Sequence, residues 1–358
     1  MMEGMQVAYT LEQCWHRVPG GTGVAALRTA VAMEEFGDIE LIGVAGKHAY
    51  PPADEWLPPI PVRHLPLAAP WLYHAWLSVH WPRPESVVPD AQVVHATTLI
   101  ACPTTKPLVV TLHDLAFMHD SSHFTRHGNQ VFRRSLRIIR RKADLVLCCS
   151  QATLDDCVKA GIGADRLRLV PLGVEIAPAS TDEILRVRET HQLPQRYLLF
   201  VGTVEPRKNL HGLAAAIALL EDPLPLVVVG AAGWGDAAAA ISGDVRFLGF
   251  VPNEDLGPLY AGAHVFCYPS EREGYGLPVL EAMAQGTPVV TSRGTATEET
   301  AGGAAVLVDP ADPVDIARGI SEASLRRDEL SLQGRRRAAQ STWAMTAALT
   351  RAAYRELV

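Results

Sequence analysis

Short apolar runs rich in valine and leucine alternate along this chain with longer stretches of helical character. Runs of this length are typical of strands buried on both faces, and repeated strand–helix–strand units indicate a parallel sheet covered by helices. The first half of the chain contains five predicted strands: Met5–Thr10, Ile39–Val44, Val93–Ala96, Leu108–Leu112 and Leu145–Cys149. The predicted helices between some of them are Thr22–Phe36, Asn129–Lys142 and Gln151–Gly161.

A second series of the same kind begins near residue 197. Its predicted strands are Tyr197–Val201, Leu226–Val229, Val245–Leu248, Val265–Tyr268, Pro288–Ser292 and Ala304–Val308, and its predicted helices are Leu210–Leu220, Asp255–Ala261, Leu277–Gln285 and Pro313–Glu322. The segment Pro171–Thr181 between the series has no clear periodicity and is the expected linker. We therefore predict an α/β protein with two doubly wound domains, residues 1–172 and 173–340, facing each other across a cleft. A last helix falls within 341–358, and the pattern does not assign its docking.

Composition excludes several other classes of protein. With 48% hydrophobic and 20% charged residues the chain is globular, and its net charge of −7 argues against general nucleic-acid binding. Met1–Thr10 lacks the features of a signal peptide, and the uncharged run Leu65–Pro82 is too interrupted to span a bilayer. We expect a cytoplasmic protein. Six cysteines without metal-type spacing are expected to be reduced core residues: Cys14, Cys102, Cys148, Cys149, Cys157 and Cys267.

The most informative stretch is E-G-Y-G-L-P-V-L-E, from Glu273 to Glu281. Pro278 suits the first turn of a helix, and Gly274 and Gly276 let the backbone approach a ligand closely. The free amides at such a helix start suit a phosphate group. We expect Glu281 in the first turn, where its carboxylate can accept two ribose hydroxyls, and Glu273 just before the helix. The alternative is a helix N-terminus stabilised by its own acidic residues.

A second group of charged residues follows the predicted strand that ends near Gly202. The loop carries Arg207 and Lys208, and Asn209 can cap the next helix. Two cations at the carboxyl end of a parallel strand, beside a helix start, are positioned for a diphosphate. The alternative is that both are ordinary exposed loop charges.

The first half of the chain adds a glycine-rich turn and a histidine. The turn P-G-G-T-G, Pro19–Gly23, follows the first strand and opens a helix, which makes it a weak candidate for a phosphate cradle. His113 stands at the end of a predicted strand and precedes Asp114, a position where an isolated histidine is often structural. Other histidines nearby have no second ligand motif, so we predict no metal site among His119, His123 and His127.

Four segments, in the order in which they occur along the chain, resemble those of the retaining glycosyltransferases of family 4, which have the GT-B fold. Glu273 to Glu281 is similar to the family's E-x7-E motif, and the segment 201–209 is similar to its diphosphate-binding loop. The segment 170–174 resembles the linker between domains, and 247–251 resembles the loop that meets the nucleobase. One departure is Thr203, where many members carry an arginine. The loop form V-G-T-x-E-P-R-K-N-L is most like bacterial mannosyltransferases of polysaccharide and O-antigen assembly.

The resemblance implies transfer of a hexose from a nucleotide-diphosphate sugar with retention of anomeric configuration. It favours GDP-mannose as the donor, with a UDP-sugar as the alternative. It assigns catalytic roles to His113, Arg207, Lys208 and Glu273. The residues it places against the donor are Gly21, Thr22, Gly23, Gly202, Val251, Gly274, Tyr275, Gly276, Leu277 and Glu281. Because no D-x-D motif occurs, we expect no metal and no other cofactor, with Arg207 and Lys208 neutralising the leaving diphosphate.

The acceptor is the least constrained part of this prediction. It is expected to be a carbohydrate, a lipid-linked carbohydrate or a small molecule. Tryptophans at positions 56, 71, 76 and 81 could stack on a sugar, meet a membrane interface, or simply pack an irregular insertion. A basic helix over 133–142 is either a solvated face or a contact to anionic lipid, which leaves peripheral membrane association open.

Three other functions remain open at this stage. A nucleotide-sugar epimerase or a phosphorylase of similar fold would use the same kind of site. A non-catalytic sugar-nucleotide binding protein would need fewer of the charged residues.

Overall fold

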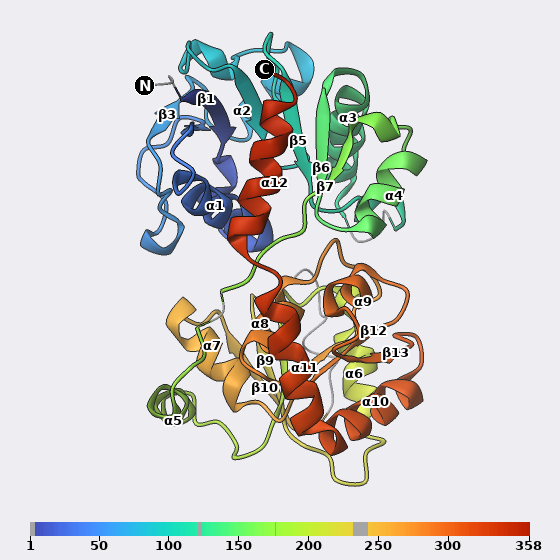
Figure 1. Cartoon of the computed structure of the whole chain (residues 1–358). Helices are drawn as coiled ribbons and strands as arrows, with labels where there is room; N and C mark the ends of the chain where they lie inside the picture. Colours follow the sequence, from blue (N-terminus) through green and yellow to red (C-terminus); the bar gives the residue numbers. More distant parts are fainter. Residues whose placement is uncertain (1–3, 121–123, 176, 232–242) are drawn as a thin grey trace. The chain divides into compact units, whose positions relative to one another are not determined.

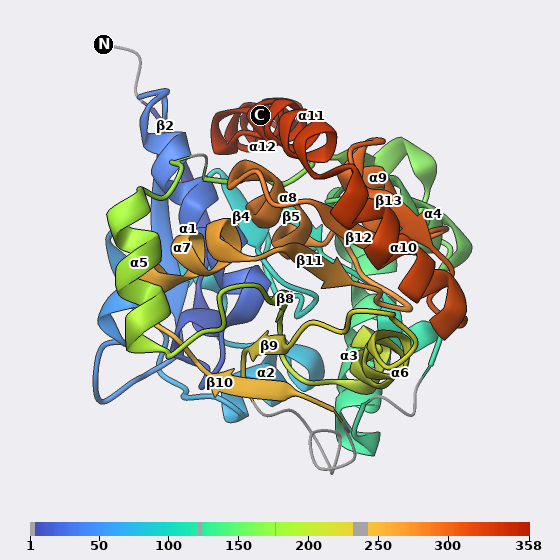
Figure 2. The same cartoon turned by 90° about the horizontal axis from the view of Figure 1, so that it is seen from below.

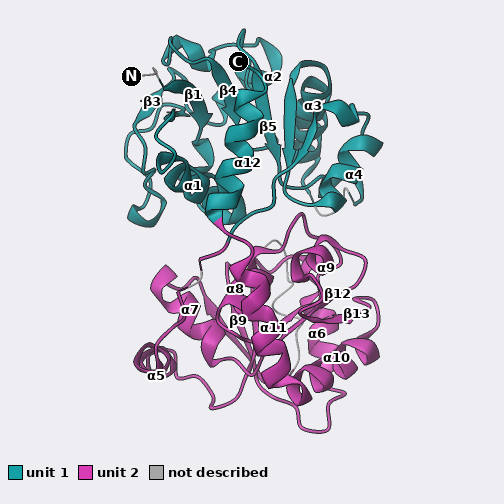
Figure 3. Ribbon diagram, in the orientation of Figure 1, with its two compact units in different colours: residues 1–173, 343–358 teal, residues 174–342 magenta. Residues whose placement is uncertain are grey.

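The computed structural model describes residues 4–120, 124–175, 177–231 and 243–358, and it consists of two compact units (Figures 1 and 3). Unit 1 comprises Met1–Gly173 together with Trp343–Val358, and unit 2 comprises Val174–Thr342. Each unit is built on a parallel sheet, which confirms the predicted α/β class. The C-terminal segment belongs to unit 1, so the chain returns to its first unit after completing the second.

Unit 1 contains a seven-stranded sheet in the order β3-β2-β1-β4-β5-β6-β7. The strands are β1 Met5–Thr10, β2 Ile39–Ala45, β3 Val62–His64, β4 Val93–Ala96, β5 Leu108–Leu112, β6 Leu145–Cys148 and β7 Leu167–Leu169. All neighbouring pairs are parallel, and β1 lies between β2 and β4. The order reverses at β1, and in such sheets ligands bind at the carboxyl ends of the strands beside the reversal.

The helices of unit 1 are α1 Gly20–Glu34, α2 Trp71–Ser78, α3 Arg126–Lys142, α4 Gln151–Lys159 and α12 Trp343–Arg355. Short 3₁₀ turns join them: η1 Glu12–Trp15, η2 Asp54–Trp56, η3 Pro84–Ser86, η4 Ala116–Met118 and η6 Ala164–Arg166. The starts of α3 and α4 are capped by the hydroxyls of Thr125 and Ser150, which accept from backbone amides one turn ahead. Two of the four tryptophans of the tryptophan-rich segment lie in α2, where Trp76 is buried and Trp71 is exposed.

Helix α12 docks on unit 1 through contacts between residues far apart in the sequence. The Arg351 guanidinium donates two 2.8 Å hydrogen bonds to the Asp38 carboxylate. The Tyr354 hydroxyl lies 2.6 Å from Nδ1 of His95, a buried residue of β4. Ala347 packs in the same core as Tyr354, against α1. These contacts give the last helix the docking place that the sequence pattern left unassigned.

Unit 2 contains a six-stranded parallel sheet in the order β10-β9-β8-β11-β12-β13, which can be followed in Figure 2. The strands are β8 Leu198–Val201, β9 Leu226–Val229, β10 Val245–Gly249, β11 Val265–Tyr268, β12 Val289–Ser292 and β13 Val306–Val308. The helices are α5 Thr181–Thr190, α6 Leu210–Ile217, α7 Asn253–Gly262, α8 Leu277–Ala284, α9 Ala296–Ala301, α10 Pro313–Leu325 and α11 Arg327–Ala339, with the 3₁₀ turn η7 Pro206–Lys208. β8 and β11 are adjacent, so their carboxyl ends bring two sequence motifs to one edge of the sheet.

The six cysteines are buried and free of disulfide bonds, as predicted for core residues. None of the helices that the structure describes combines the length and the apolar character needed to cross a bilayer.

Candidate active site

The turn after β8 places two cations at the carboxyl edge of the unit 2 sheet. Pro206 starts the 3₁₀ turn η7, whose last two residues are Arg207 and Lys208. Asn209 follows in the left-handed conformation, with a φ of 57°, and caps α6 by accepting a hydrogen bond from the Gly212 amide. Its amide nitrogen also donates to the Pro310 carbonyl at 2.6 Å. The predicted cap is therefore present, and it fixes the turn that carries the cations.

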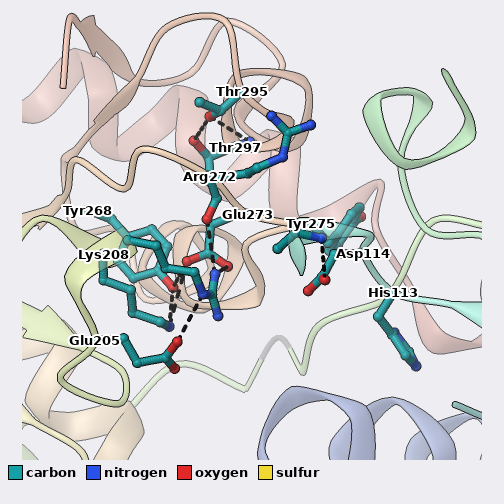
Figure 4. Close-up of polar contacts among 12 residues, drawn as sticks. His113, Asp114, Glu205, Lys208, Tyr268, Arg272, Glu273, Tyr275, Thr295 and Thr297 are labelled. Atoms are coloured by element: carbon teal, nitrogen blue, oxygen red, sulfur yellow. Dashed lines mark hydrogen bonds and ion pairs between the residues drawn. The ribbon is translucent and has the colours of Figure 1, made fainter. Parts of the chain in front are cut away.

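Glu273 contacts both cations, and Figure 4 shows it beside Lys208 and Tyr268. Its carboxylate is 3.1 Å from the Arg207 guanidinium and 3.6 Å from the Lys208 ammonium. The Tyr268 hydroxyl donates to Glu273 at 2.9 Å and accepts from Lys208 at 2.7 Å. Arg207 also contacts the Glu205 carboxylate at 2.9 Å. The structure thus brings together three residues that the sequence analysis singled out in two separate motifs.

Burial and charge together determine the protonation of this cluster. The side chains of Lys208 and Glu273 are each only 10% exposed. Burial alone would raise the pKa of Glu273, but Lys208 and Arg207 outweigh it and lower that pKa to about 2. Burial would likewise lower the pKa of Lys208, and the Glu273 carboxylate raises it above its ordinary value. Lys208 and Glu273 are therefore both ionised at neutral pH, and the two cations of the cluster lie against two carboxylates, Glu273 and Glu205.

Two glycines beside the cluster have backbone conformations that other residues adopt with strain. Gly202 directly follows β8 with a φ of 149°, and a Cβ there would lie 2.7 Å from Lys208 Nζ. Gly276 precedes α8 with a φ of 96°, and a Cβ there would lie 2.7 Å from Thr297 Cγ2. Both positions need glycine, one to admit the lysine and the other to admit the start of α9.

Glu281 does not stand where the sequence analysis expected it. Helix α8 begins at Leu277, directly after the left-handed Gly276, so Glu281 is its fifth residue and lies beyond the first turn. Its carboxylate accepts a 2.7 Å hydrogen bond from the Tyr260 hydroxyl of α7. Burial raises the pKa of Glu281. The expectation of a first-turn carboxylate is therefore wrong, although the side chain remains on the helix that follows Glu273.

The remaining predicted donor contacts in unit 2 differ in exposure. Tyr275 and Leu277 are buried, and the Tyr275 carbonyl accepts a 2.6 Å hydrogen bond from the Thr300 hydroxyl. Val251 is buried as well, whereas Phe250 beside it is 59% exposed. Gly274, between Glu273 and Tyr275, is buried.

One residue of the cluster was absent from the sequence prediction. Tyr268 is the last residue of β11, in an apolar run that indicates only a buried strand. Its position three residues after the strand start and five before Glu273 carries no separate signal of function. The polar tip of a tyrosine at the carboxyl end of a strand is the feature that could have pointed to it.

In unit 1, His113 directly follows β5 and is held by a neighbouring strand. Its Nε2 lies 3.2 Å from the Thr97 carbonyl, which can only accept, so Nε2 carries the proton and Nδ1 is left as an acceptor. Burial lowers the pKa of His113, which favours this neutral form. The Thr97 hydroxyl donates in turn to the Thr10 carbonyl at 2.6 Å. The end of β5 therefore presents a neutral, oriented imidazole.

The glycine-rich turn of unit 1 opens α1. The exposed Gly21 and the Thr22 residue lie in its first turn, and the Thr22 hydroxyl donates to the Pro19 carbonyl at 3.1 Å. Gly23 is buried, and a Cβ there would lie 3.1 Å from the ring of Trp56. Gly23 thus has a packing reason to be glycine, in addition to any contact with a ligand.

Two of the three histidines considered for a metal site, His119 and His127, have separate surroundings. His119 lies 2.8 Å from the Asp156 carboxylate, the His127 ring packs near His74, and His123 falls outside the described residues. Within the described ranges no group of three or more His, Cys, Asp or Glu side chains is arranged to hold a metal ion.

Comparison with known families matches both units. The model described as "Glycosyltransferase Family 4" matches residues 19–177, and "Glycosyl transferases group 1" matches residues 195–324. The chain is 35% identical to O-antigen chain mannosyltransferase B of Escherichia coli over 268 residues, which cover 70% of each protein. It is 28% identical to the serotype-specific mannosyltransferase WbdA of Escherichia coli over 265 residues. The aligned residues make up 67% of this chain but only 32% of that longer protein.

Solved structures share the fold at low sequence identity. The crystal structure of Anabaena Alr3699/HepE in complex with UDP and glucose matches 99% of this chain and 100% of its own, with a TM-score of 0.76 and 19% identity. WaaG, a glycosyltransferase involved in lipopolysaccharide biosynthesis, matches with a TM-score of 0.71 and 17% identity, over 97% of this chain and 98% of its own. These likenesses confirm the predicted GT-B architecture of paired Rossmann-like domains.

Proposed function

Because the chain belongs to glycosyltransferase family 4, as its motifs predicted, we propose that this glycosyltransferase moves a hexose from a nucleotide-diphosphate sugar with retention of configuration. Mannose, carried by GDP, is the favoured donor, and a metal ion takes no part. The observation that carries the proposal is the ionised cluster of Arg207, Lys208 and Glu273 at the carboxyl ends of β8 and β11.

The two cations supply what a leaving diphosphate needs. Bond cleavage at the anomeric carbon leaves a nucleoside diphosphate with additional negative charge, and fixed positive groups lower the energy of that state. Arg207 offers a planar fork of donors, while Lys208 offers a compact charge already held by Tyr268. Both groups are mostly buried, so their field is less screened by water than that of loop cations on the surface. In this proposal they replace the divalent metal of other glycosyltransferases.

The other residues are assigned by the family resemblance and by their chemistry. Glu273 would accept hydroxyls of the donor sugar, Glu281 would accept ribose hydroxyls, and His113 would contact the transferred sugar. The neutral His113 ring can accept a sugar hydroxyl at Nδ1, because Nε2 is already engaged. A phosphate oxygen of the donor, rather than a protein base, would take the acceptor's proton.

The donor preference rests on relatives rather than on geometry. O-antigen chain mannosyltransferase B and WbdA are mannosyltransferases by name, and so is the MMP alpha-(1->4)-mannosyltransferase of Mycolicibacterium hassiacum, which is 32% identical over 62% of this chain and 56% of its own length. Among solved structures, HepE binds UDP and glucose. GDP-mannose is therefore proposed first, with a UDP-hexose as the alternative donor. A carbohydrate or a lipid-linked carbohydrate is the proposed acceptor.

Ligand-induced thermal stabilisation tests the donor and the metal together. The protein is heated with GDP, UDP or ADP, each with and without EDTA. A ligand at 100 times its dissociation constant adds about 2.7 kcal/mol to the unfolding free energy. We expect stabilisation by GDP that survives EDTA. Loss of the effect in EDTA would overturn the metal-free site, and a larger effect of UDP would reassign the donor.

Transfer itself is tested with GDP-mannose and a mannose-terminated oligosaccharide. We expect a product lengthened by one mannose, with the α configuration of the donor retained in the anomeric NMR coupling. Interconversion of the donor without any acceptor would instead indicate an epimerase, and a requirement for free phosphate would indicate a phosphorylase. Binding of GDP without any turnover would support the non-catalytic alternative.

We also propose that the protein works in the cytoplasm, with peripheral contact to anionic membrane through the basic helix α3. Sedimentation with anionic vesicles at low salt, compared with neutral vesicles, tests this contact. Recovery of all protein in the supernatant at low salt would argue against it.

A further inference from the structure

Tyr260 is a buried tyrosine of unit 2 that has no part in the mechanism proposed for the transfer. It lies near the end of α7 and is only 2% exposed. Its hydroxyl donates a 2.7 Å hydrogen bond to Oε2 of Glu281, on helix α8. A phenylalanine would fill the same apolar space, so packing alone does not account for the hydroxyl. The contribution of the hydroxyl is therefore its contact with Glu281.

The Tyr260 hydroxyl is held in one place by the contacts of the rest of the residue. The ring packs edge-on against Phe266 of β11, with the ring centroids 5.3 Å apart and the planes at 71°. The Tyr260 carbonyl accepts a 2.6 Å hydrogen bond from the Thr287 hydroxyl, which lies just before β12. Ring and backbone are thus fixed by two different parts of the sheet. A donor fixed in this way also fixes the carboxylate oxygen that accepts from it.

Helix α7 is also anchored by contacts outside this pair. The buried Asp255 carboxylate, in the first turn of α7, lies 2.8 Å from the Arg186 guanidinium of α5. The buried Tyr197 hydroxyl donates a 2.7 Å hydrogen bond to the Leu259 carbonyl. Loss of the Tyr197 hydroxyl would therefore disturb α7 one residue before Tyr260 without removing any contact to the carboxylate of α8. This neighbouring tyrosine provides a matched control.

Glu281 depends on a fixed donor because a glutamate side chain has several rotatable bonds. Within the described ranges, no group other than the Tyr260 hydroxyl donates a hydrogen bond to its carboxylate. Burial raises the pKa of Glu281, whereas the Tyr260 hydrogen bond and the Lys208 charge act to lower it. An ionised carboxylate offers about four lone-pair sites on its two oxygens, and Tyr260 takes one of them. The others can accept two neighbouring hydroxyl groups of a ligand.

We infer that Tyr260 is a positioning residue for the nucleotide: its hydroxyl holds the Glu281 carboxylate in the orientation that accepts the 2′ and 3′ hydroxyls of a nucleoside diphosphate. The inference rests on the proposed function, in which Glu281 contacts the ribose while Arg207 and Lys208 contact the diphosphate. A site built to accept hydroxyls rejects a ligand that lacks them, because its polar group is then left unpaired. Tyr260 therefore sets the preference of unit 2 for ribose, and it does so through Glu281 rather than by contact with the ligand.

Isothermal titration with GDP and with 2′,3′-dideoxy-GDP tests this role. We expect wild type to bind GDP at least about tenfold more tightly than the dideoxy analogue. Tyr260→Phe should bind GDP about tenfold more weakly than wild type does, but the dideoxy analogue within about twofold of wild type, because the diphosphate contacts remain. Tyr197→Phe should keep the wild-type preference for GDP. UDP and ADP are measured with their dideoxy analogues in the same way, since all three nucleotides carry the same ribose.

A double-mutant cycle with Glu281→Gln shows whether Tyr260 acts through the carboxylate. Glu281→Gln should itself lose most of the preference for GDP over the dideoxy analogue. In that background Tyr260→Phe should change the affinity for GDP by less than about twofold, because the hydroxyl no longer has a carboxylate to position. Each substitution keeps the size of the side chain that it replaces, so the variants should fold, and circular dichroism melting checks this.

Three results would overturn the inference and leave the proposed transferase standing. Equal weakening of GDP and its dideoxy analogue in Tyr260→Phe would mean that the hydroxyl only supports α7. A wild-type preference for ribose in Tyr260→Phe would mean that Glu281 needs no positioning. Additive effects of Tyr260→Phe and Glu281→Gln would mean that the two side chains act separately. Absence of binding by GDP, UDP and ADP at millimolar concentration would instead overturn the proposed donor site, and this inference with it.

Discussion

The Tyr268 hydroxyl accepts a 2.7 Å hydrogen bond from the Lys208 ammonium. The same hydroxyl donates to the Glu273 carboxylate at 2.9 Å, whereas the direct distance from Lys208 to Glu273 is 3.6 Å. A neutral group thus joins the cation to the anion and sets their separation. Strand β11 therefore positions the Lys208 and Glu273 charges through the side chain of its last residue, Tyr268.

Removal of the Tyr268 hydroxyl should show whether nucleotide binding depends on the positions of the Lys208 and Glu273 charges or only on their presence. In Tyr268→Phe both charges remain but lose their shared partner, so we expect about 1–2 kcal/mol lower unfolding free energy and weaker nucleotide binding. Tyr197→Phe is the matched control, because its buried hydroxyl donates to the Leu259 carbonyl elsewhere in unit 2. Urea denaturation and nucleotide titration measure both effects. Equal nucleotide affinity in the two variants would show that Tyr268 has only a structural role.

Glu273→Gln should change both activity and the dependence of stability on pH. The folded pKa of Glu273 is about 2, below its ordinary 4.5, so the folded state binds this proton less readily than the unfolded state. The carboxylate's stabilisation is therefore complete above pH 4.5 and is lost as the pH falls toward 2, with a size on the order of 3 kcal/mol. We expect the difference in unfolding free energy between wild type and variant to shrink between pH 5 and pH 3.

Transfer activity provides the second measurement on the same variant. Without its carboxylate the cluster loses the partner that Arg207 and Lys208 share and its acceptor for sugar hydroxyls, so we expect turnover to fall about 100-fold. Glu271→Gln, at an exposed position in the same loop, should leave turnover unchanged. A pH-independent stability difference would contradict the ionised state assigned to Glu273.

Gly202→Ala should disturb the site through Lys208. The new Cβ would lie 2.7 Å from Lys208 Nζ, and the backbone has a φ of 149°. We expect a loss of about 1–3 kcal/mol in stability and at least tenfold weaker nucleotide binding, because the ammonium must move. Gly243→Ala carries a similar strain, with a φ of 115°, but among the described residues no atom lies within 4 Å of its Cβ. Nucleotide titration of both variants tests this, and equal affinities would show that strain, not displacement of Lys208, is the cause.

The sequence predicted the buried strands well because burial on both faces leaves a continuous apolar run. Met5–Thr10, Val93–Ala96 and Val265–Tyr268 are strands with the predicted bounds. The edge strands β3 and β7 were not predicted, since each has three residues and a charged one among them. Helix α11 was missed as well because its sequence is polar on most sides and shows little periodicity.

The site could be predicted where its charged residues lie in short, continuous sequence motifs. Two loops after adjacent strands brought Arg207, Lys208 and Glu273 together, as parallel-sheet topology requires. The helix start at Leu277 was predicted correctly, but the first-turn position of Glu281 was wrong because Glu281 is the fifth residue from that start. Tyr268 could not be separated from other buried aromatics without knowing what faces it.

The docking of α12 gives the last prediction, because it depends on a buried histidine. His95 contacts the Tyr354 hydroxyl at 2.6 Å through Nδ1 and the Thr111 hydroxyl at 2.8 Å through Nε2. Burial lowers the pKa of His95 to about 3, so the folded state keeps it neutral while the unfolded state takes up a proton near pH 6.5. Its stabilisation is full above pH 6.5 and decreases as the pH falls toward 3, by up to about 1.4 kcal/mol for each pH unit.

Urea denaturation between pH 7 and pH 4, followed through the unit 1 transition, measures this effect. His95→Gln cannot titrate, so we expect its unfolding free energy to fall less steeply with decreasing pH than that of wild type. Tyr354→Phe keeps the histidine and should lower the unfolding free energy by about 1 kcal/mol while keeping the wild-type slope. If His95→Gln and wild type had the same slope, His95 would be protonated in the folded protein and α12 would be held by a charged group.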